Sequence, residues 1–185
     1  MNDVLKTIAG RRSVRQYREE QIKNAELHAI LEAGLQAPSG HNDQSWYFAV
    51  VQNRERIDEI NEGCKAGMRE SNVEWIVDLG KKEKYNIFYN APTVVIVAAK
   101  KDAISQVADV STAIENMMIA AESLEIGSCW MGFARFYFSG PESYKRVGIP
   151  DGYEVFYGFT LGYKLAGLKL NSPQRKYEKY YHVIR

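Results

Sequence analysis

An uninterrupted apolar run is the feature that most constrains how this chain can fold. Residues Thr93–Ala98 follow a proline and are almost all β-branched, which predicts a strand buried on both faces. The next stretch, Ser105–Glu125, has apolar residues three or four positions apart, which predicts a long helix with Gly127 at its C-terminal cap. Because a buried strand must be covered on each side of its sheet, we expect helices on both faces.

The remaining segments alternate between strand and helix periodicity. Strands are predicted at Trp46–Val51, Cys129–Phe133 and Glu154–Tyr163. Helices are predicted from Asp3, over about Asn24–Gln36, and in a short segment that ends near Gly148. Residues 53–88 have the character of polar, irregular helix. Helices separate nearly all of the strands, which is typical of an α/β or an α+β fold. The polar, aromatic tail from Lys164 onward has little periodicity, so we expect it to pack outside this core, with a second subunit as a candidate surface.

The composition excludes several classes of protein. The 185 residues carry 24 Lys and Arg against 23 Asp and Glu, so no overall field draws the chain to nucleic acid or to a membrane surface. Two cysteines and three scattered histidines provide neither a disulfide framework nor the spacing of a metal site. No run is long enough to span a bilayer, and the first residues lack the apolar stretch of a signal peptide. We therefore expect one soluble, cytoplasmic domain over residues 1–185.

A cluster of cationic side chains follows the first predicted helix. Arg11, Arg12, Ser13 and Arg15 place three guanidinium groups and a hydroxyl within five residues. Arginine offers paired, planar donors, so such a cluster can surround one phosphate group. A solvated basic patch or a minor nucleic-acid contact would produce the same pattern. Nucleic acid is disfavoured because its binding usually needs many phosphate contacts.

Two further segments have the character of ligand loops. Residues 37–46 place small and polar side chains between a helix and a strand, and the amides of Asn42 and Gln44 both donate and accept hydrogen bonds. An ordinary turn explains that segment equally well. In the second segment, Gly127 and Gly132 bracket a short predicted strand and would let a ligand approach the backbone. Cys129, within it, is more simply explained as a small core residue than as a reactive thiol.

Taken in order, these segments resemble the nitroreductase family of flavin enzymes nearly from end to end. The matching pieces are Arg11–Arg15, Ala37–Trp46, Ala91-Pro92 before its strand, the long helix into Gly127, Trp130-Met131-Gly132, Gly148-Ile149-Pro150, Leu161-Gly162-Tyr163 and a basic residue, Arg175. The resemblance implies an α+β fold with a central mixed β-sheet flanked by helices. It also implies an intertwined homodimer that binds FMN at its interface, with residues 164–185 as an extension that reaches the partner subunit.

The resemblance assigns roles to particular residues. It implies that Arg11, Arg12, Ser13 and Arg15 bind the FMN phosphate and pyrimidine edge, with Arg175 returning to the phosphate. The loop of the other subunit would supply Pro38, Ser39, Gly40, Asn42 and Gln44. Trp130, Met131 and Gly132 would lie along the isoalloxazine ring, where a backbone N–H faces the hydride-accepting atom N5. The family usually has proline where this chain has Ser45, and residues 63–90 match poorly, so none of them is assigned.

The activity implied is that of an FMN-dependent NAD(P)H oxidoreductase. Hydride would pass from NADH or NADPH to the flavin, the nicotinamide would leave, and a flat small-molecule acceptor such as a nitroaromatic or quinone would take its place. FMN carries the electron transfer, so no catalytic side-chain acid or base is required. The alternative is a flavin-binding sensor or flavin-processing protein without reductase turnover. A nucleic-acid module built on the basic segment is a third hypothesis.

Overall fold

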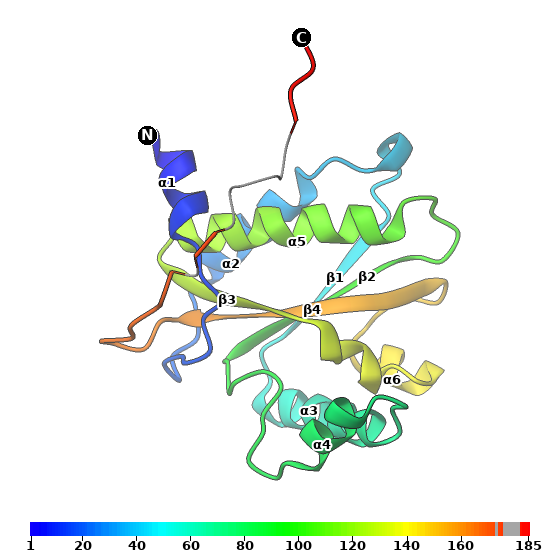
Figure 1. Cartoon of the computed structure of the whole chain (residues 1–185). Helices are drawn as coiled ribbons and strands as arrows, with labels where there is room; N and C mark the ends of the chain where they lie inside the picture. The colour runs from blue at the N-terminus through cyan, green and yellow to red at the C-terminus, as the bar shows by residue number, and fades with distance from the viewer. Residues whose placement is uncertain (173, 176–181) are drawn as a thin grey trace.

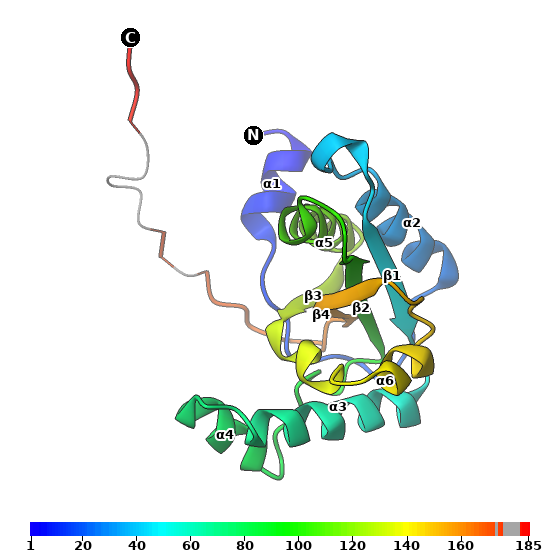
Figure 2. The ribbon, with the colours of Figure 1, turned by 90° about the vertical axis from the view of Figure 1, so that its right-hand side faces the viewer.

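The computed structural model describes residues 1–172, 174–175 and 182–185, and it has three layers (Figure 1). The middle layer is a sheet of four strands: β1 (Trp46–Val51), β2 (Thr93–Lys100), β3 (Ile126–Met131) and β4 (Tyr153–Tyr163). One face carries α1 (Asp3–Gly10), α2 (Asn24–Leu35) and α5 (Gln106–Ser123). The other carries α3 (Arg54–Arg69), α4 (Glu74–Lys81) and α6 (Pro141–Arg146). Figure 2 shows the sheet from another side, with α5 on one face and α3 on the other.

The strand order is β1-β2-β4-β3, and every neighbouring pair in the sheet is antiparallel. The α+β class is confirmed, but the sheet is not mixed as predicted. The reason is the position of β4: α5 connects β2 to β3, which run the same way, and β4 lies between them and runs against both. Outside the four strands, Ser13 and Ser128 form an isolated bridge that is parallel.

Strand β2 explains why the core has two halves. Alternate side chains of a strand point to opposite faces of the sheet. Val95, Val97 and Ala99 belong to the core beneath α2 and α5, whereas Val94, Ile96 and Ala98 belong to the core beneath α3. All six are fully buried, as expected for an uninterrupted apolar strand that is covered on both sides.

The turn after α5 corrects two predictions. The helix ends at Ser123, and Glu125 turns the chain with a positive φ of 61°. Gly127 is therefore a residue of β3 and not a helix cap, and β3 ends at Met131, before a 3₁₀ segment at Gly132–Tyr137. A side chain is excluded at Gly127 because a Cβ there would lie 2.8 Å from Cγ1 of Val14. Close packing against the segment after α1 explains this glycine.

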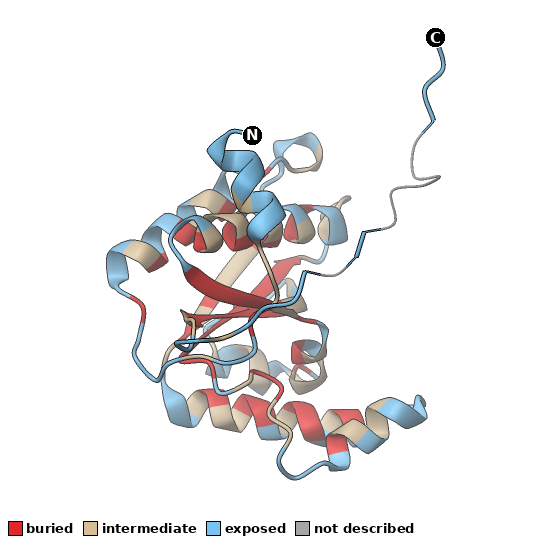
Figure 3. Cartoon of the chain, turned by 60° about the vertical axis from the view of Figure 1, so that its left-hand side comes forward, coloured by how far each residue is buried: buried red, intermediate tan, exposed pale blue. Residues whose placement is uncertain are grey.

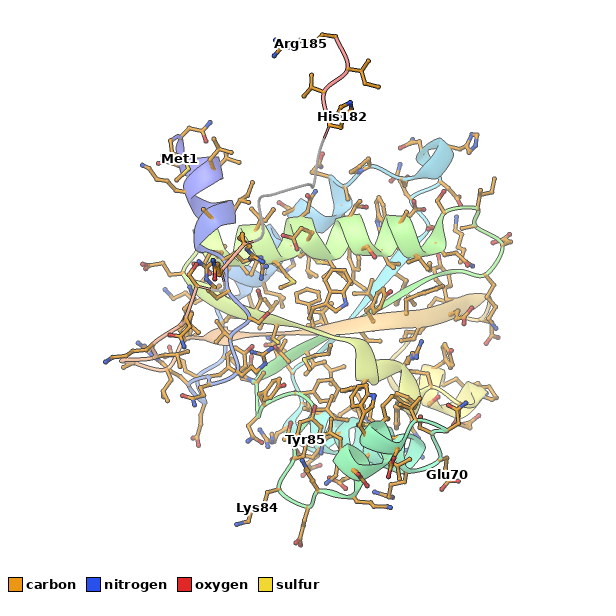
Figure 4. All side chains as sticks on the ribbon, in the orientation of Figure 1. Met1, Glu70, Lys84, Tyr85, His182 and Arg185 are labelled. Carbon is orange, nitrogen blue, oxygen red and sulfur yellow. The ribbon has the colours of Figure 1, made fainter. Side chains whose placement is uncertain are left out.

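The region predicted as irregular helix contains α3 and α4. Helix α3 buries Ile57, Ile60, Cys64 and Met68 at helical spacing against the sheet. Beyond α4, Lys84 points away from the molecule while Tyr85 is half-buried (Figure 4).

Among the described residues, no helix combines the length and the apolar character that crossing a membrane requires.

Candidate functional site

A cavity of about 500 Å³ lies where the first basic segment meets the C-terminal tail. It is lined by Arg11, Arg12, Ser13, Arg15, Lys169, Leu170, Asn171 and Arg175. The structure therefore brings together all five of the residues that were assigned to the phosphate. Five of the lining side chains are cationic and none is acidic, so the cavity suits an anion.

The basic segment is held in place by strand β3. The N–H of Val14 donates to the carbonyl of Ser128 at 2.8 Å, and the Tyr17 hydroxyl donates to the carbonyl of Val14 at 2.5 Å. Val14 is fully buried, whereas Ser13 and Arg15 on either side of it are not. Because neighbouring side chains of an extended segment alternate in direction, anchoring Val14 in the core turns Ser13 and Arg15 outward.

The three arginines of the segment have different surroundings. Arg11 reaches Glu115 of α5 at 3.5 Å, and its Nη1 atom is buried without a hydrogen-bond partner among the described residues. Arg12 donates to the carbonyls of Ala9 and Arg11, both at 2.7 Å, and to the hydroxyl of Ser172 at 2.5 Å. Arg12 therefore ties the end of α1 to the tail. A buried guanidinium nitrogen that lacks an acceptor is costly, so the surroundings of Arg11 call for an added anion.

Aromatic and thiol groups surround Arg15. Its guanidinium carbon lies 5.6 Å from the centre of the Tyr89 ring, within the range of a cation–π interaction. Burial raises the pKa of Cys129, while the charge of Arg15 and a hydrogen bond from Ser13 act in the opposite direction. Burial also raises the pKa of Tyr85 to about 12. These groups are neutral at physiological pH, so Cys129 lacks the thiolate that a nucleophile needs.

The predicted ring-binding segment lies at the end of β3. Met131 is buried, and Trp130 packs edge-on against Tyr157 with ring centres 5.1 Å apart. Gly132 is exposed, and nothing lies within 4 Å of where its Cβ would be. Strand β3 thus leads from Ser128, which pairs with the basic segment, toward Gly132, the exposed residue that directly follows the strand. A flat ligand could lie along that edge.

The loop Pro38–Gln44 does not line this cavity. It packs on the N-terminal half of α5, where the N–H of Gly40 donates to Oδ1 of Asp109 at 2.9 Å and Thr112 donates to the carbonyl of Pro38 at 3.2 Å. The end of α1 lies instead near Glu122, about 20 Å further along the helix. Figure 1 shows α1 and this loop over opposite ends of α5. Within one chain, the two predicted parts of the site stay apart.

Sequence reasoning missed several residues near the arginines. Lys169 and Asn171 line the cavity, and Tyr89 contacts Arg15. Lys169 is close in sequence to Arg175, which was already expected to reach the phosphate. That closeness could have identified Lys169 as a further candidate. Tyr89 had no such signal, because its place depends on a backbone with φ of 52°, which a non-glycine residue rarely adopts.

Comparisons with known proteins identify the family of the chain. The model of the nitroreductase family matches residues 8–163. A protein of Archaeoglobus fulgidus with the provisional name NADH dehydrogenase/NAD(P)H nitroreductase is 32% identical over 168 residues, which cover 88% of this chain and 86% of that protein.

Solved structures are similar over their whole length. A nitroreductase of Bacteroides fragilis with bound FMN is 37% identical with a TM-score of 0.93, and each chain is covered completely. A nitroreductase of Desulfitobacterium hafniense, also with bound FMN, is 28% identical with a TM-score of 0.90 and equally complete coverage. From the fold, the family match and these relatives, we conclude that the chain belongs to the nitroreductase family.

Proposed function

We propose that this protein is an FMN-dependent oxidoreductase that uses NADH or NADPH to reduce a flat small-molecule acceptor, such as a nitroaromatic or a quinone, in a ping-pong reaction. Its family and its FMN-bound relatives support flavin-dependent oxidoreduction with a nicotinamide donor. The observation that carries the proposal for this chain is the buried Nη1 atom of Arg11, which lacks a partner among the described residues beside a cavity of cationic side chains.

The residues present fit the phosphate of FMN. A phosphate monoester carries up to two negative charges and three acceptor oxygens, and Arg11, Ser13 and Arg15 offer matching donors. Each charge-assisted hydrogen bond contributes about 1.5–3 kcal/mol. Arg175 and Lys169 add charge from the tail. Arg12, already bonded to main-chain carbonyls, would contribute through its charge more than through new hydrogen bonds.

The end of β3 would hold the ring system. When bound, FMN supplies hydride transfer at its N5 atom, while the protein supplies binding, orientation and electrostatics. A main-chain N–H from Trp130–Gly132 would donate a hydrogen bond at N5, and the positive charge of Arg15 would favour electron density on the pyrimidine side of the ring. The exposed, unobstructed position of Gly132 leaves room for that approach.

A homodimer would complete the site, because the loop Pro38–Gln44 lies away from the arginine cavity of its own chain. In the proposed dimer, Pro38, Ser39, Gly40, Asn42 and Gln44 face the flavin of the partner. Helix α1 has no buried residue (Figure 3). Its apolar residues Val4, Leu5 and Ile8 are between 48% and 62% exposed. His182 and Arg185 stand clear of the helical layers in Figure 4. An apolar helix and an outlying terminus both suit a partner subunit.

The proposal is tested by colour and its loss. The purified protein should be yellow, and NADH or NADPH should bleach it under anaerobic conditions. A colourless protein that cannot be reconstituted with FMN would overturn the proposal. A yellow protein that neither nucleotide bleaches would instead favour a flavin-binding protein without reductase turnover.

Kinetics and mass test the remaining parts of the proposal. Initial rates with a quinone at several NADPH concentrations should give parallel double-reciprocal lines, and intersecting lines would contradict the ping-pong order. Light scattering should give twice the mass of one chain. A monomer at all concentrations would contradict the shared site.

A further inference from the structure

The loop Pro38–Gln44 has an unusual backbone for residues that are not glycine. His41, Asn42 and Gln44 have positive φ angles of 52°, 58° and 48°. L-residues adopt this left-handed region rarely, and it persists only where the surrounding structure enforces it. The side chains of His41, Asn42 and Gln44 are exposed, so burial of these residues does not enforce it.

Asp109 holds both sides of the strained stretch. Its Oδ1 accepts the N–H of Gly40 at 2.9 Å, and its Oδ2 accepts the hydroxyl of Ser45 at 2.7 Å. Gly40 comes directly before the strained residues and Ser45 directly after them. One carboxylate in the first turn of α5 therefore fixes the loop at its start and at its end.

The contact between Asp109 and Ser45 is buried. Asp109 is 2% exposed and Ser45 is fully buried, and among the described residues Asp109 forms no ion pair. A buried carboxylate without a cation is costly unless hydrogen bonds satisfy it, and here they come from Gly40 and Ser45. Asp109 also lies in the first turn of α5, where the helix dipole favours a negative charge. The fit also requires glycine at position 40, because a Cβ there would lie 2.4 Å from Oγ of Ser105.

We propose that Asp109 is a positioning residue for the flavin site of the partner subunit. By fixing Gly40 and Ser45, it holds Asn42 and Gln44 in the conformation in which they bind the ring. This inference rests on the proposed function, since it assigns the loop to an FMN site. It goes beyond that function because it makes a side chain on α5, remote from the arginine cavity of its own chain, a determinant of flavin affinity.

Substitutions at Asp109 and Ser45 test the role. Asp109→Leu removes both acceptors and keeps the branching of the side chain, and we expect the dissociation constant of FMN to rise at least tenfold. Asp109→Asn keeps an acceptor for Gly40 and can donate to Ser45, so it should restore affinity to within about threefold of wild type. Ser45→Ala breaks one bond only and should raise the constant about twofold to fivefold. Asp102→Leu removes an exposed charge just before α5 and is the matched control.

The measurements separate positioning from stability. FMN affinity is measured by fluorescence quenching on the apoprotein, and the thermal midpoint of each apoprotein is recorded beside it. Positioning predicts weakened binding, with an altered circular dichroism of the bound flavin, at a midpoint within a few degrees of wild type. Wild-type affinity in Asp109→Leu overturns the proposal. If that variant does not fold, wild-type affinity in Ser45→Ala overturns it instead.

Mixed dimers test whether Asp109 acts across the interface. Joining an Asp109→Leu chain to an Arg11→Ala chain places both defects in one site and leaves the other site intact, provided that the loop serves the partner. Half of the sites should then bind FMN with wild-type affinity. No tight site in the mixed dimer would overturn the proposal, whereas failure of wild-type protein to bind FMN would overturn the proposed function itself.

Discussion

The two ends of α5 carry two differently built regions. At the C-terminal end, the arginine cavity presents charge, and the Nη1 atom of Arg11 is buried without an acceptor among the described residues. At the N-terminal end, the loop Pro38–Gln44 presents a backbone shape that Asp109 holds through two hydrogen bonds. In the cavity, a buried guanidinium nitrogen lacks a hydrogen-bond acceptor among the described residues. In the loop, the hydrogen bonds to Asp109 are formed, but the backbone keeps strained, positive φ angles.

This difference indicates how each region would contribute to binding. Charge-assisted bonds to a phosphate supply affinity, and salt weakens them where they are exposed to solvent. A preformed loop supplies affinity by avoiding the cost of ordering, and salt has little effect on that. Changes in the cavity and in the loop should therefore differ in how they respond to ionic strength.

The largest expected effect comes from loosening the helix that supports both regions. Met117 is fully buried in α5 and packs against Gly34 of α2. Met117→Ala should lower the free energy of unfolding by about 2–5 kcal/mol, seen as a lower urea midpoint. The arginine cavity and the loop Pro38–Gln44 should both be disturbed, because α5 supports both. Ile104→Ala, at a position 84% exposed, should change stability by less than about 0.5 kcal/mol.

Removing one cavity arginine should weaken FMN binding without unfolding the chain. Arg11→Ala or Arg15→Ala should raise the dissociation constant of FMN about tenfold to a hundredfold, since one charge-assisted bond is worth roughly 1.5–3 kcal/mol. Titration of the apoprotein checks this. Arg54→Ala, which breaks an exposed pair with Asp58 on α3, should leave the constant unchanged. Unchanged binding in both cavity variants would contradict the phosphate assignment.

Salt should separate the two regions in the wild-type protein. Raising the ionic strength should weaken the binding of FMN severalfold but leave riboflavin, which lacks the phosphate, nearly unaffected. The salt dependence should shrink in Arg11→Ala and persist in Asp109→Leu. Equal salt dependence for the two flavins would show that the cavity does not hold the phosphate.

The smallest effect concerns the two thiols, which lie outside the loop. Burial raises the pKa of Cys64 to about 12 and also raises that of Cys129. In the unfolded chain the Cys64 thiol ionises near its ordinary value, so its contribution to stability is complete below about pH 8.5 and is lost as pH rises toward 12. The contribution of Cys129 has the same sign. Urea unfolding at pH 7 and pH 10 should show this decline, and it should shrink in Cys64→Ala. Rapid reaction of Cys129 with a thiol reagent at pH 7 in the native protein would contradict its neutral state.

Local pattern determined much of this protein. The strand β1, the core of β2 and the helices α2 and α5 follow from side-chain periodicity, which depends on neighbours a few residues away. The cluster Arg11–Arg15 could also be predicted from the sequence, because its members are close together along the chain. The pairing direction of the strands could not be predicted in this way, since it depends on the insertion of β4 between β2 and β3.

Tertiary structure alone decided where the motifs lie. Gly40 and Asp109 are separated by 69 residues, and nothing local in either segment indicates that they meet. The contact of Tyr89 with Arg15 likewise requires a left-handed backbone that the sequence does not announce. Periodicity encodes which side chains are buried, because burial of an element depends on its own face. Which segment lies against that face is the outcome of packing the whole chain, and so only the folded structure shows it.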